Sequence, residues 1–316
     1  MERLIAIIGP TAVGKTKISI DLAKMLNTEI ISGDSMLVYK NMDVGTAKPT
    51  LAERNGIIHH MVDILDPSQE FSVADFQEIA SKHITDINLR GKLPILAGGT
   101  GLYVKSLLEG YKFNSTSAST ELRGKYEALA AEMGNAYVHS LLAEVDPDNA
   151  ARLHPNDLRR VIRALEVYYC SGIAFQQSKE ATHDSELIYD ALVIGLTMER
   201  SQLYQRINHR VDLMISQGLV DEVAELLKAG VSPIAQSMKG IGYKEIISYL
   251  KGDVDLHTAT EKIKQATRHF AKRQLTWYRK MKYIVWFDVG EFSCYDDMME
   301  SFYKCIAGKF CIKSKQ

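Results

Sequence analysis

The stretch GPTAVGKT, residues 9–16, directly follows the apolar run LIAII, residues 4–8, and opens the helical pattern KTKISIDLAKML. Its spacing matches the phosphate-binding loop G-x-x-x-x-G-K-[ST] in full, between a strand and a helix as that motif requires. In such a loop, backbone N–H groups and the helix N-terminus face phosphate oxygens, the lysine adds a point charge and the threonine can bind Mg²⁺. We therefore predict a phosphate site made by Gly9, Pro10, Thr11, Ala12, Val13, Gly14, Lys15 and Thr16, with Thr16 at the metal.

Around this loop the chain alternates between strand and helix signals, which indicates a parallel α/β sheet. A helix with a capping-box start is predicted from Ser72, because Asp75 stands three residues further on and the pattern FQEIASKHITDI follows. Short buried strands are predicted where apolar runs are flanked by glycine or turn residues, at 4–8, 29–32, 93–97, 191–196 and 283–287.

The segment 113–186 breaks this alternation. It opens with the polar string NSTSAST and continues with the helical patterns ELRGKYEALAAEM, AYVHSLLAEV and NDLRRVIRALEVYY. After residue 198 the chain is again mostly helical, ending in one late strand and a short helix. We predict a P-loop NTPase-like parallel sheet core from residues 1–112 and 187–316, and a mostly helical insertion domain from 113–186.

The composition is that of a globular enzyme. The chain has 316 residues, 46% of them hydrophobic, and a formal net charge of −1, which argues against indiscriminate binding of nucleic acid. No apolar run approaches the ~20 residues of a membrane span, and the N-terminal run is too short for a signal peptide. The cysteines lack Cys-x-x-Cys and zinc-ligand spacing, which predicts reduced thiols in the cytoplasm at Cys170, Cys294, Cys305 and Cys311.

A metal-binding carboxylate at a strand end accompanies most phosphate loops. Here Asp63, Asp66 and Asp288 are the only candidates, and none follows the expected pattern closely. The strand at 93–97 ends in Gly98-Gly99-Thr100-Gly101 without an acid. The site is therefore predicted to bind a diphosphate without the usual apparatus of nucleotide hydrolysis.

Asp34 stands just beyond the predicted strand 29–32. Because the carboxyl ends of parallel strands form the ligand crevice of an open α/β sheet, we expect its side chain to face the phosphate loop. The structural alternative is a turn residue or a helix cap, which is the more frequent role of an isolated aspartate at a strand end.

Several blocks of sequence together resemble the tRNA dimethylallyltransferase family, in that family's order. They are GPTAVGKT, ISGDSMLVYKNMDVGTAKP, HHMVDILDPSQEFSVADF, LPILAGGTGLYVKSLLEG, RLHPNDLRRVIRALEVY and the arginine-rich stretch up to AKRQLTWYRK. The resemblance extends from residue 4 to about residue 287 and implies the bacterial form, because the zinc-finger extension of eukaryotic relatives is missing. One departure is Leu37, where the family often has Gln.

The resemblance implies that the phosphates belong to dimethylallyl diphosphate and that the acceptor is the exocyclic amine of the adenosine 3′ of a tRNA anticodon. It implies that Asp34 is the general base and reads the adenine, and that Thr100 and Arg210 lie at the diphosphate. Neutralisation of the leaving diphosphate by Lys15, Arg210 and Mg²⁺ would be the largest catalytic contribution, with one carboxylate removing the proton. It also implies a monomer with no obligate protein partner and no membrane contact.

By the same resemblance the insertion embraces the tRNA anticodon stem. The residues predicted to bind tRNA are Asp34, Ser35, Met36, Leu37, Thr100, Arg123, Arg159, Arg160, Val161, Ile162, Arg163, Lys239, Gly240, Gly242, Tyr243, Lys244, Arg268, Lys272, Arg273 and Gln274.

Basic residues gather in two places. Between residues 264 and 282 there is no Asp or Glu, and Lys264, Arg268 and Lys272 follow i, i+4 spacing with aromatic residues close behind. Such a stripe is typical of a helix that follows an RNA backbone, although a solvated helix face has the same pattern. A second helical cluster contains Arg152, Arg159, Arg160 and Arg163. No spacing supports a metal site among the histidines, so structural or RNA-adjacent roles are predicted for His59, His60, His154 and His209.

Two other classes of protein share the phosphate loop. An ATP-dependent small-molecule kinase would require an acidic metal-binding strand end and a pair of lid arginines, and it leaves the basic helix and the insertion unexplained. A nucleotide-switch protein would require a base-specificity motif, and none is visible.

Overall fold

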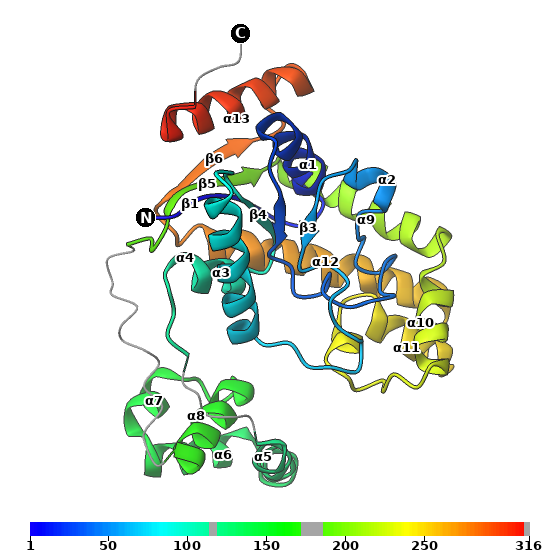
Figure 1. The fold of residues 1–316 in the computed structure, drawn as a ribbon. Helices are drawn as coiled ribbons and strands as arrows, with labels where there is room; N and C mark the ends of the chain where they lie inside the picture. Colours follow the sequence, from blue (N-terminus) through cyan, green and yellow to red (C-terminus); the bar gives the residue numbers. More distant parts are fainter. Residues whose placement is uncertain (114–118, 172–185, 313–316) are drawn as a thin grey trace. The chain divides into compact units, whose positions relative to one another are not determined.

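The computed structural model describes residues 1–113, 119–171 and 186–312 (Figure 1). The chain divides into two compact units, Met1–Gly110 with Ser185–Gln316, and Tyr111–Asp184. The sequence-based boundaries were residues 113 and 186. Most of the predicted polar string NSTSAST lies outside the described residues.

Within the described part of the first unit, six parallel strands form one sheet in the order β3-β2-β4-β1-β5-β6. The predicted parallel sheet is confirmed, and five of these strands were expected. Strand β3 was missed because it has only two residues and no apolar run, and it is a strand only through its pairing with β2. The strands are β1 Arg3–Ile8, β2 Ile30–Ser32, β3 His59–His60, β4 Ile95–Gly98, β5 Asp190–Thr197 and β6 Ile284–Asp288.

Helices cover both faces of the sheet (Figure 1). Because side chains alternate along a strand, Ile5 and Ile7 of β1 face one core, while Leu4, Ala6 and Ile8 face the other. The first core is closed by α1 (Lys15–Leu26) and α13 (Tyr295–Phe310). The second is closed by α3 (Val73–Leu89), α4 (Gly101–Leu108), α10 (Leu219–Lys228) and α11 (Tyr243–Leu250). Helices α9 (Arg200–Ser216) and α12 (Leu256–Tyr278) contribute to both.

Two sequence predictions about helices are tested directly. The capping box at Ser72 is confirmed, because its hydroxyl accepts from the Asp75 N–H while the Asp75 carboxylate accepts from the Ser72 N–H. The terminal helix α13 was expected to be short but has 16 residues. The remaining short elements of this unit are α2 (Leu51–Arg54) and the 3₁₀ turn η1 (Ser237–Lys239). None of the helices in the described ranges is long and apolar enough to cross a membrane.

The second unit is helical over its described residues and has its own core. Its helices are α5 (Thr120–Met133), α6 (Asn135–Val145), α7 (Pro147–Arg152) and α8 (Leu158–Ser171). Helix α7 was not predicted, since it is a single short segment that starts at a proline. Residues from α5, α6, α7 and α8 share one buried apolar cluster, which includes Tyr126, Leu142 and Leu165.

The sheet places three loop segments at one edge. Strands β1, β2 and β4 end in register, with Ile8 opposite Gly98 and Ser32 opposite Ala97. The segments that follow are the phosphate loop, the turn at Asp34 and the turn at Thr100. Glycine permits this approach, because a Cβ on Gly98 would lie 2.4 Å from the Gly33 carbonyl group. The predicted crevice therefore lies where the rule for open α/β sheets puts it.

Candidate active site

The phosphate loop is held in its binding shape by the protein itself. Gly9 has φ 148° and a Cβ there would lie 2.7 Å from the Leu196 carbonyl oxygen, so only glycine fits so close to β5. The Lys15 ammonium donates to the carbonyl oxygens of Gly9 (2.9 Å) and Pro10 (2.8 Å). The cation therefore lies inside the loop, where it can exchange these carbonyls for phosphate oxygens.

Gln274 braces this loop from α12. Its side-chain oxygen accepts from the Thr11 N–H at 2.9 Å, and its side-chain nitrogen donates to the Gly99 carbonyl at 2.8 Å. The residue is only 5% exposed. Both ends of its amide are thus used within the protein, and Gln274 joins the phosphate loop to the turn after β4.

Asp34 and Thr100 belong to one hydrogen-bonded turn. The Asp34 carboxylate accepts from the Met36 N–H at 2.8 Å. The Thr100 hydroxyl accepts from the Ser35 N–H at 3.1 Å and donates to the Ser35 hydroxyl at 3.3 Å. Thr100 therefore fixes the turn that carries the Asp34 carboxylate.

A small cavity of about 70 Å³ brings Asp34 together with Lys15 and Thr16. The structure therefore places the predicted carboxylate beside the phosphate loop, as the sheet topology required. Leu37 lines the same cavity, and its apolar side chain offers no hydrogen bond to a base.

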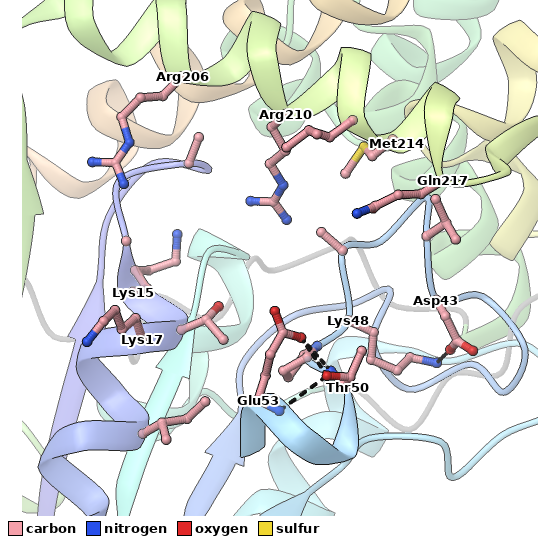
Figure 2. Close-up of a pocket in the computed structure, with 18 of the residues that line it drawn as sticks. Lys15, Lys17, Asp43, Lys48, Thr50, Glu53, Arg206, Arg210, Met214 and Gln217 are labelled. Atoms are coloured by element: carbon pink, nitrogen blue, oxygen red, sulfur yellow. Dashed lines mark hydrogen bonds and ion pairs between the residues drawn. The ribbon is translucent and has the colours of Figure 1, made fainter. Parts of the chain in front are cut away.

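A larger cavity of about 760 Å³ lies over the phosphate loop, between residues 43–50 and α9 (Figure 2). Arg210 extends from α9 toward the loop, with a guanidinium nitrogen 3.5 Å from the Thr11 hydroxyl. Arg206 lies one turn earlier on the same face of α9 and lines the same cavity. Arg206 was not predicted, although its i, i+4 spacing from Arg210 is visible in the sequence.

The electrostatics of this cavity are those of an anion site. Burial, and then the nearby Arg210 cation, lower the pKa of Lys15 to about 7, while Asp34 opposes the shift. Burial likewise lowers the pKa of Arg210, again opposed by Asp34. Lys15 and Arg210 are thus held close together in a poorly solvated place, and Asp34 is the carboxylate that opposes both shifts. A bound polyanion would relieve the repulsion between these two cations.

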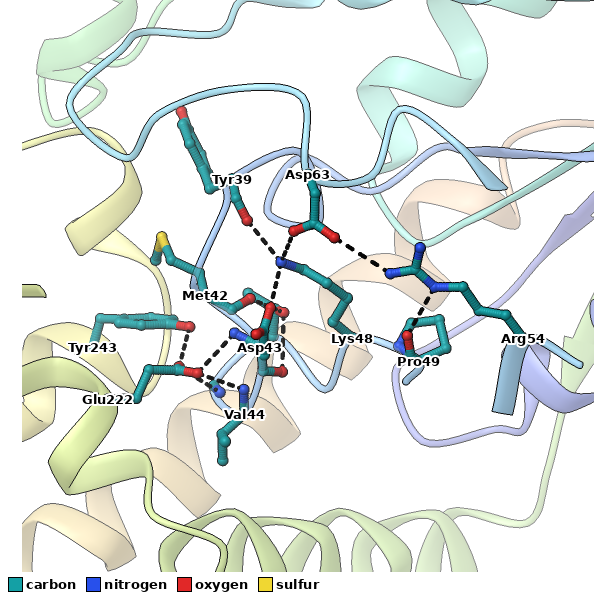
Figure 3. A network of polar contacts seen from close by, with 12 residues as sticks. Tyr39, Met42, Asp43, Val44, Lys48, Pro49, Arg54, Asp63, Glu222 and Tyr243 are labelled. Carbon is teal, nitrogen blue, oxygen red and sulfur yellow. Dashed lines mark hydrogen bonds and ion pairs between the residues drawn. The ribbon is translucent and has the colours of Figure 1, made fainter. Parts of the chain in front are cut away.

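The wall formed by residues 43–50 is clamped from α10 by Glu222 (Figure 3). Its carboxylate accepts from the N–H groups of Asp43 (2.7 Å), Val44 (2.7 Å) and Gly45 (3.0 Å), and from the Tyr243 hydroxyl (2.7 Å). Tyr243 is fully buried, and its pKa is raised by burial and by Glu222. Tyr243 therefore supports the Glu222 carboxylate that holds the cavity wall.

Lys48, a buried member of the same wall, ties it to the neighbouring segments (Figure 3). The Lys48 ammonium pairs with Asp43 at 2.6 Å and Asp63 at 2.5 Å, and donates to the Tyr39 carbonyl at 2.7 Å. Asp63, one of the candidate metal ligands, is thus already engaged, also with Arg54 at 3.4 Å. No group of three or more His, Cys, Asp or Glu side chains in the described ranges is placed to hold a metal.

The predicted RNA-binding residues differ in accessibility. Those that lie at buried positions are Val161, Ile162, Gly242, Tyr243 and Gln274. Gly240 packs close to the Met36 methyl group. Exposed positions, which remain available for the predicted contact, are Arg159, Arg160, Lys239, Lys244, Lys272 and Arg273.

The basic residues of α12 lie in two different environments, one against α9 and one in an open groove. Lys264 is 15% exposed and pairs with Asp212 of α9 at 2.8 Å, and Arg268 donates to Asn208 of α9 at 2.7 Å. These two residues therefore pack α12 against α9. Lys272 and Arg273 instead line an open groove of about 490 Å³ together with Trp277.

Fold and site define a P-loop α/β protein in which Asp34, Lys15 and Arg210 lie at the phosphate loop. The family model described as "IPP transferase" matches residues 37–281, and "Isopentenyl transferase" matches residues 2–64. A tRNA dimethylallyltransferase of Bacillus anthracis is 50% identical over 313 residues, covering 99% of this chain and 98% of the relative. The chain belongs to the tRNA dimethylallyltransferase family of prenyltransferases.

Solved structures agree with this assignment. A tRNA isopentenylpyrophosphate transferase from Bacillus halodurans superposes with a TM-score of 0.73 at 46% identity, over 98% of this chain and 97% of that one. A eukaryotic dimethylallyltransferase acting on tRNA superposes with a TM-score of 0.83 at 31% identity, over 100% of this chain and 81% of that one. The P-loop fold prediction is confirmed, and the relationship favours a prenyltransferase over the small-molecule kinase.

Proposed function

We propose that this chain transfers the dimethylallyl group of dimethylallyl diphosphate to the exocyclic amine of the adenosine 3′ of a tRNA anticodon. A C–N bond forms to the amine, the C–O bond to diphosphate breaks, and one proton leaves the nitrogen. The observation that carries the proposal is the cluster of Asp34, Lys15 and Arg210 at the phosphate loop, where Lys15 lines one cavity with Asp34 and another with Arg210. A relative that aligns over nearly its full length is named tRNA dimethylallyltransferase, and a similar solved structure is of a eukaryotic dimethylallyltransferase acting on tRNA.

The cations of the pocket act on the leaving group. The phosphate-loop N–H groups and Lys15 bind the diphosphate, and Arg210 balances charge that develops on it as the C–O bond breaks. Thr16 and Asp34 line one cavity and offer the hard oxygen ligands that Mg²⁺ prefers, so these residues fit that ion. Bound Mg²⁺ would supply further neutralisation of the diphosphate.

Asp34 acts on the acceptor. An exocyclic amine is a weak nucleophile, and a carboxylate within hydrogen-bond reach can orient it and take its proton. Thr100 keeps the Asp34 turn in place through Ser35. To reach the pocket, the adenosine must leave the stack of the anticodon loop.

The direct test uses unmodified tRNA, labelled dimethylallyl diphosphate and Mg²⁺ without ATP. Transfer of label to the tRNA is expected, and a transcript with the target adenosine replaced by guanosine should stay unlabelled. The absence of label transfer to the unmodified tRNA under these conditions would contradict the proposal.

The proposed partner is the anticodon stem–loop, bound in part by the basic residues of α12. Replacing both Lys272 and Arg273 with Glu should raise the tRNA KM. It should also reduce the slope of log affinity for tRNA against log salt concentration by about one unit per lost phosphate contact. A matched control reverses Lys82 and Lys304, exposed lysines of α3 and α13. An unchanged salt slope in the first variant would assign these two residues to a solvated helix face.

Lys15 makes diphosphate binding pH-dependent. With a pKa of about 7 in the free protein, the amine is mostly neutral at pH 8, and a bound diphosphate should raise this pKa. Binding at pH 8 should therefore take up about one proton per ligand, and binding at pH 6 much less. Calorimetry of dimethylallyl diphosphate binding in buffers of different ionisation enthalpy measures the uptake. Equal uptake by a Lys15→Met variant would show that another group is responsible.

The chain is proposed to act as a monomer in the cytoplasm, where it meets newly made tRNA. Insertion residues of the second unit are proposed to hold the anticodon stem, with Arg123, Arg159, Arg160 and Arg163 as the cationic contacts.

A further inference from the structure

Helix α8 of the second unit carries positive charge near its N-terminus, which is the positive end of the helix dipole. Its first two turns contain Arg159, Arg160 and Arg163, while no acidic residue stands in the first turn. Positive charge near a helix N-terminus is unfavourable. Asp157 offsets only part of it, through an ion pair with Arg160 at 3.2 Å. Local rules broken in this way are typical of functional sites.

A buried carboxylate lies one turn beyond these arginines. Glu166 of α8 is 0% exposed. Its Oε1 accepts from the Ser119 N–H at 2.7 Å and from Arg123 Nε at 2.9 Å. Its Oε2 accepts from Arg123 at 3.2 Å and from Arg163 at 2.5 Å. Glu166 thus holds Arg123 of α5 side-on through two nitrogens and Arg163 of α8 through one.

The Glu166 carboxylate is ionised where it meets the two arginines. Burial alone would raise the pKa of Glu166, but hydrogen bonds from Arg163, Arg123 and the Ser119 N–H lower it, so the carboxylate stays ionised. One negative charge therefore meets two guanidinium groups. The arginine side chains are 42% and 34% exposed, so the positive edge of the cluster reaches solvent.

Two oriented guanidinium groups that both reach solvent match a phosphate group. Planar guanidinium forks recognise phosphate oxygens by paired hydrogen bonds. Fixing long side chains before binding reduces the entropy lost when the complex forms. A single buried carboxylate that contacts arginines of two helices can fix both side chains without exposing its own negative charge at the surface.

We propose that Glu166 is a positioning residue that pre-orients Arg123 and Arg163 for a phosphate of the tRNA backbone. The inference rests on the proposed function, which makes tRNA the ligand of the second unit. Glu166 itself does not contact the RNA.

The test is whether Glu166→Gln strengthens or weakens the binding of tRNA. Glu166→Gln removes a negative charge near a polyanion, so simple electrostatics predicts tighter tRNA binding. Positioning predicts the opposite, because both arginines lose the group that holds them. We expect the tRNA KM to rise about tenfold, the loss of one charge-assisted contact. Glu144→Gln removes the same charge from an exposed position on α6 and should leave the KM unchanged or slightly lower.

Further readouts separate positioning from a purely structural role. The KM for dimethylallyl diphosphate and the kcat at saturating tRNA should stay near parental values, since that substrate binds to the first unit. In a double-mutant cycle, Glu166→Gln should add little to the tRNA KM of Arg123→Gln with Arg163→Gln. A parental or lower tRNA KM for Glu166→Gln would overturn the inference, as would full additivity in the cycle.

If circular dichroism shows that Glu166→Gln unfolds at a lower temperature than the parent, a second variant that conserves charge replaces it in the test. Arg123→Lys keeps the cation but loses the side-on fork. Positioning predicts a raised tRNA KM for this variant, whereas an unchanged KM would overturn the inference. If the parent enzyme transfers label to tRNA and these variants do not differ from it, only the inference fails. If the parent transfers none, the proposed function fails and the inference falls with it.

Discussion

Replacing Asp34 by asparagine is expected to lower the single-turnover rate of prenyl transfer about 10²–10⁴-fold, the usual contribution of a positioned general base. Asparagine keeps the shape of the side chain and the oxygen that accepts from the Met36 N–H, so the turn should persist. It cannot take a proton from the amine. The affinities for dimethylallyl diphosphate and for tRNA should each change by less than roughly tenfold, because the loss falls on the chemical step.

Rapid-quench measurement with enzyme in excess over labelled tRNA isolates that step from product release. Asp253→Asn, which removes a carboxylate from an exposed turn, serves as the matched control and should retain the parental rate. Transfer by Asp34→Asn at near the parental rate would make Asp34 a structural turn residue, and the base would have to be sought elsewhere.

Lys15→Ala is expected to reduce kcat/KM for dimethylallyl diphosphate by about 10²–10³-fold, the scale seen when one donor to a developing anion is removed. The ammonium lies inside the phosphate loop, 2.9 Å from the Gly9 carbonyl oxygen, where diphosphate oxygens would bind. Since this charge faces the leaving group, kcat should fall along with the affinity for diphosphate. The fold should be retained, because the loop is also held by Gln274 through the Thr11 N–H.

The control for this variant is Lys24→Ala, an exposed lysine in the last turn of the same helix α1. Steady-state kinetics with saturating tRNA compare the two variants, and thermal melting checks that both are folded. If Lys15→Ala matched the parent in these kinetics, the phosphate loop would be vestigial and the diphosphate would bind elsewhere.

The local parts of the fold could be predicted from sequence because their signals are local. Helix α1 was predicted with its observed bounds Lys15–Leu26, and the capping box at Ser72 was recognised from residues three apart. Strand β3 could not be predicted in this way. Its two histidines are a strand only because Ile30 and Ile31 of β2 pair with them.

In the candidate site, too, the local motifs could be predicted from sequence and the contacts between distant segments could not. The phosphate loop is a contiguous motif, and Asp34 follows from the rule that parallel strands end at one edge. The bonds that hold these groups join distant segments. Thr11 and Gln274 are 263 residues apart, and Gly45 and Glu222 are 177 apart. No spacing in the sequence indicates that such residues meet, so neither the brace at Gln274 nor the wall clamp at Glu222 was predicted.

The sequence by itself determined the phosphate loop, the parallel sheet, the family and the placement of Asp34 at the crevice, because short motifs and apolar periodicity encode them. Only the tertiary structure decided which side chains are free to act. Helical spacing puts Lys264, Arg268 and Lys272 on related faces of α12, but it cannot tell which face a neighbouring helix covers. Packing against α9 occupies Lys264 and Arg268 and leaves Lys272 exposed. Likewise, only the packing of α5 on α8 brings Glu166 between two arginines, because a buried charge persists where its partners come from both helices.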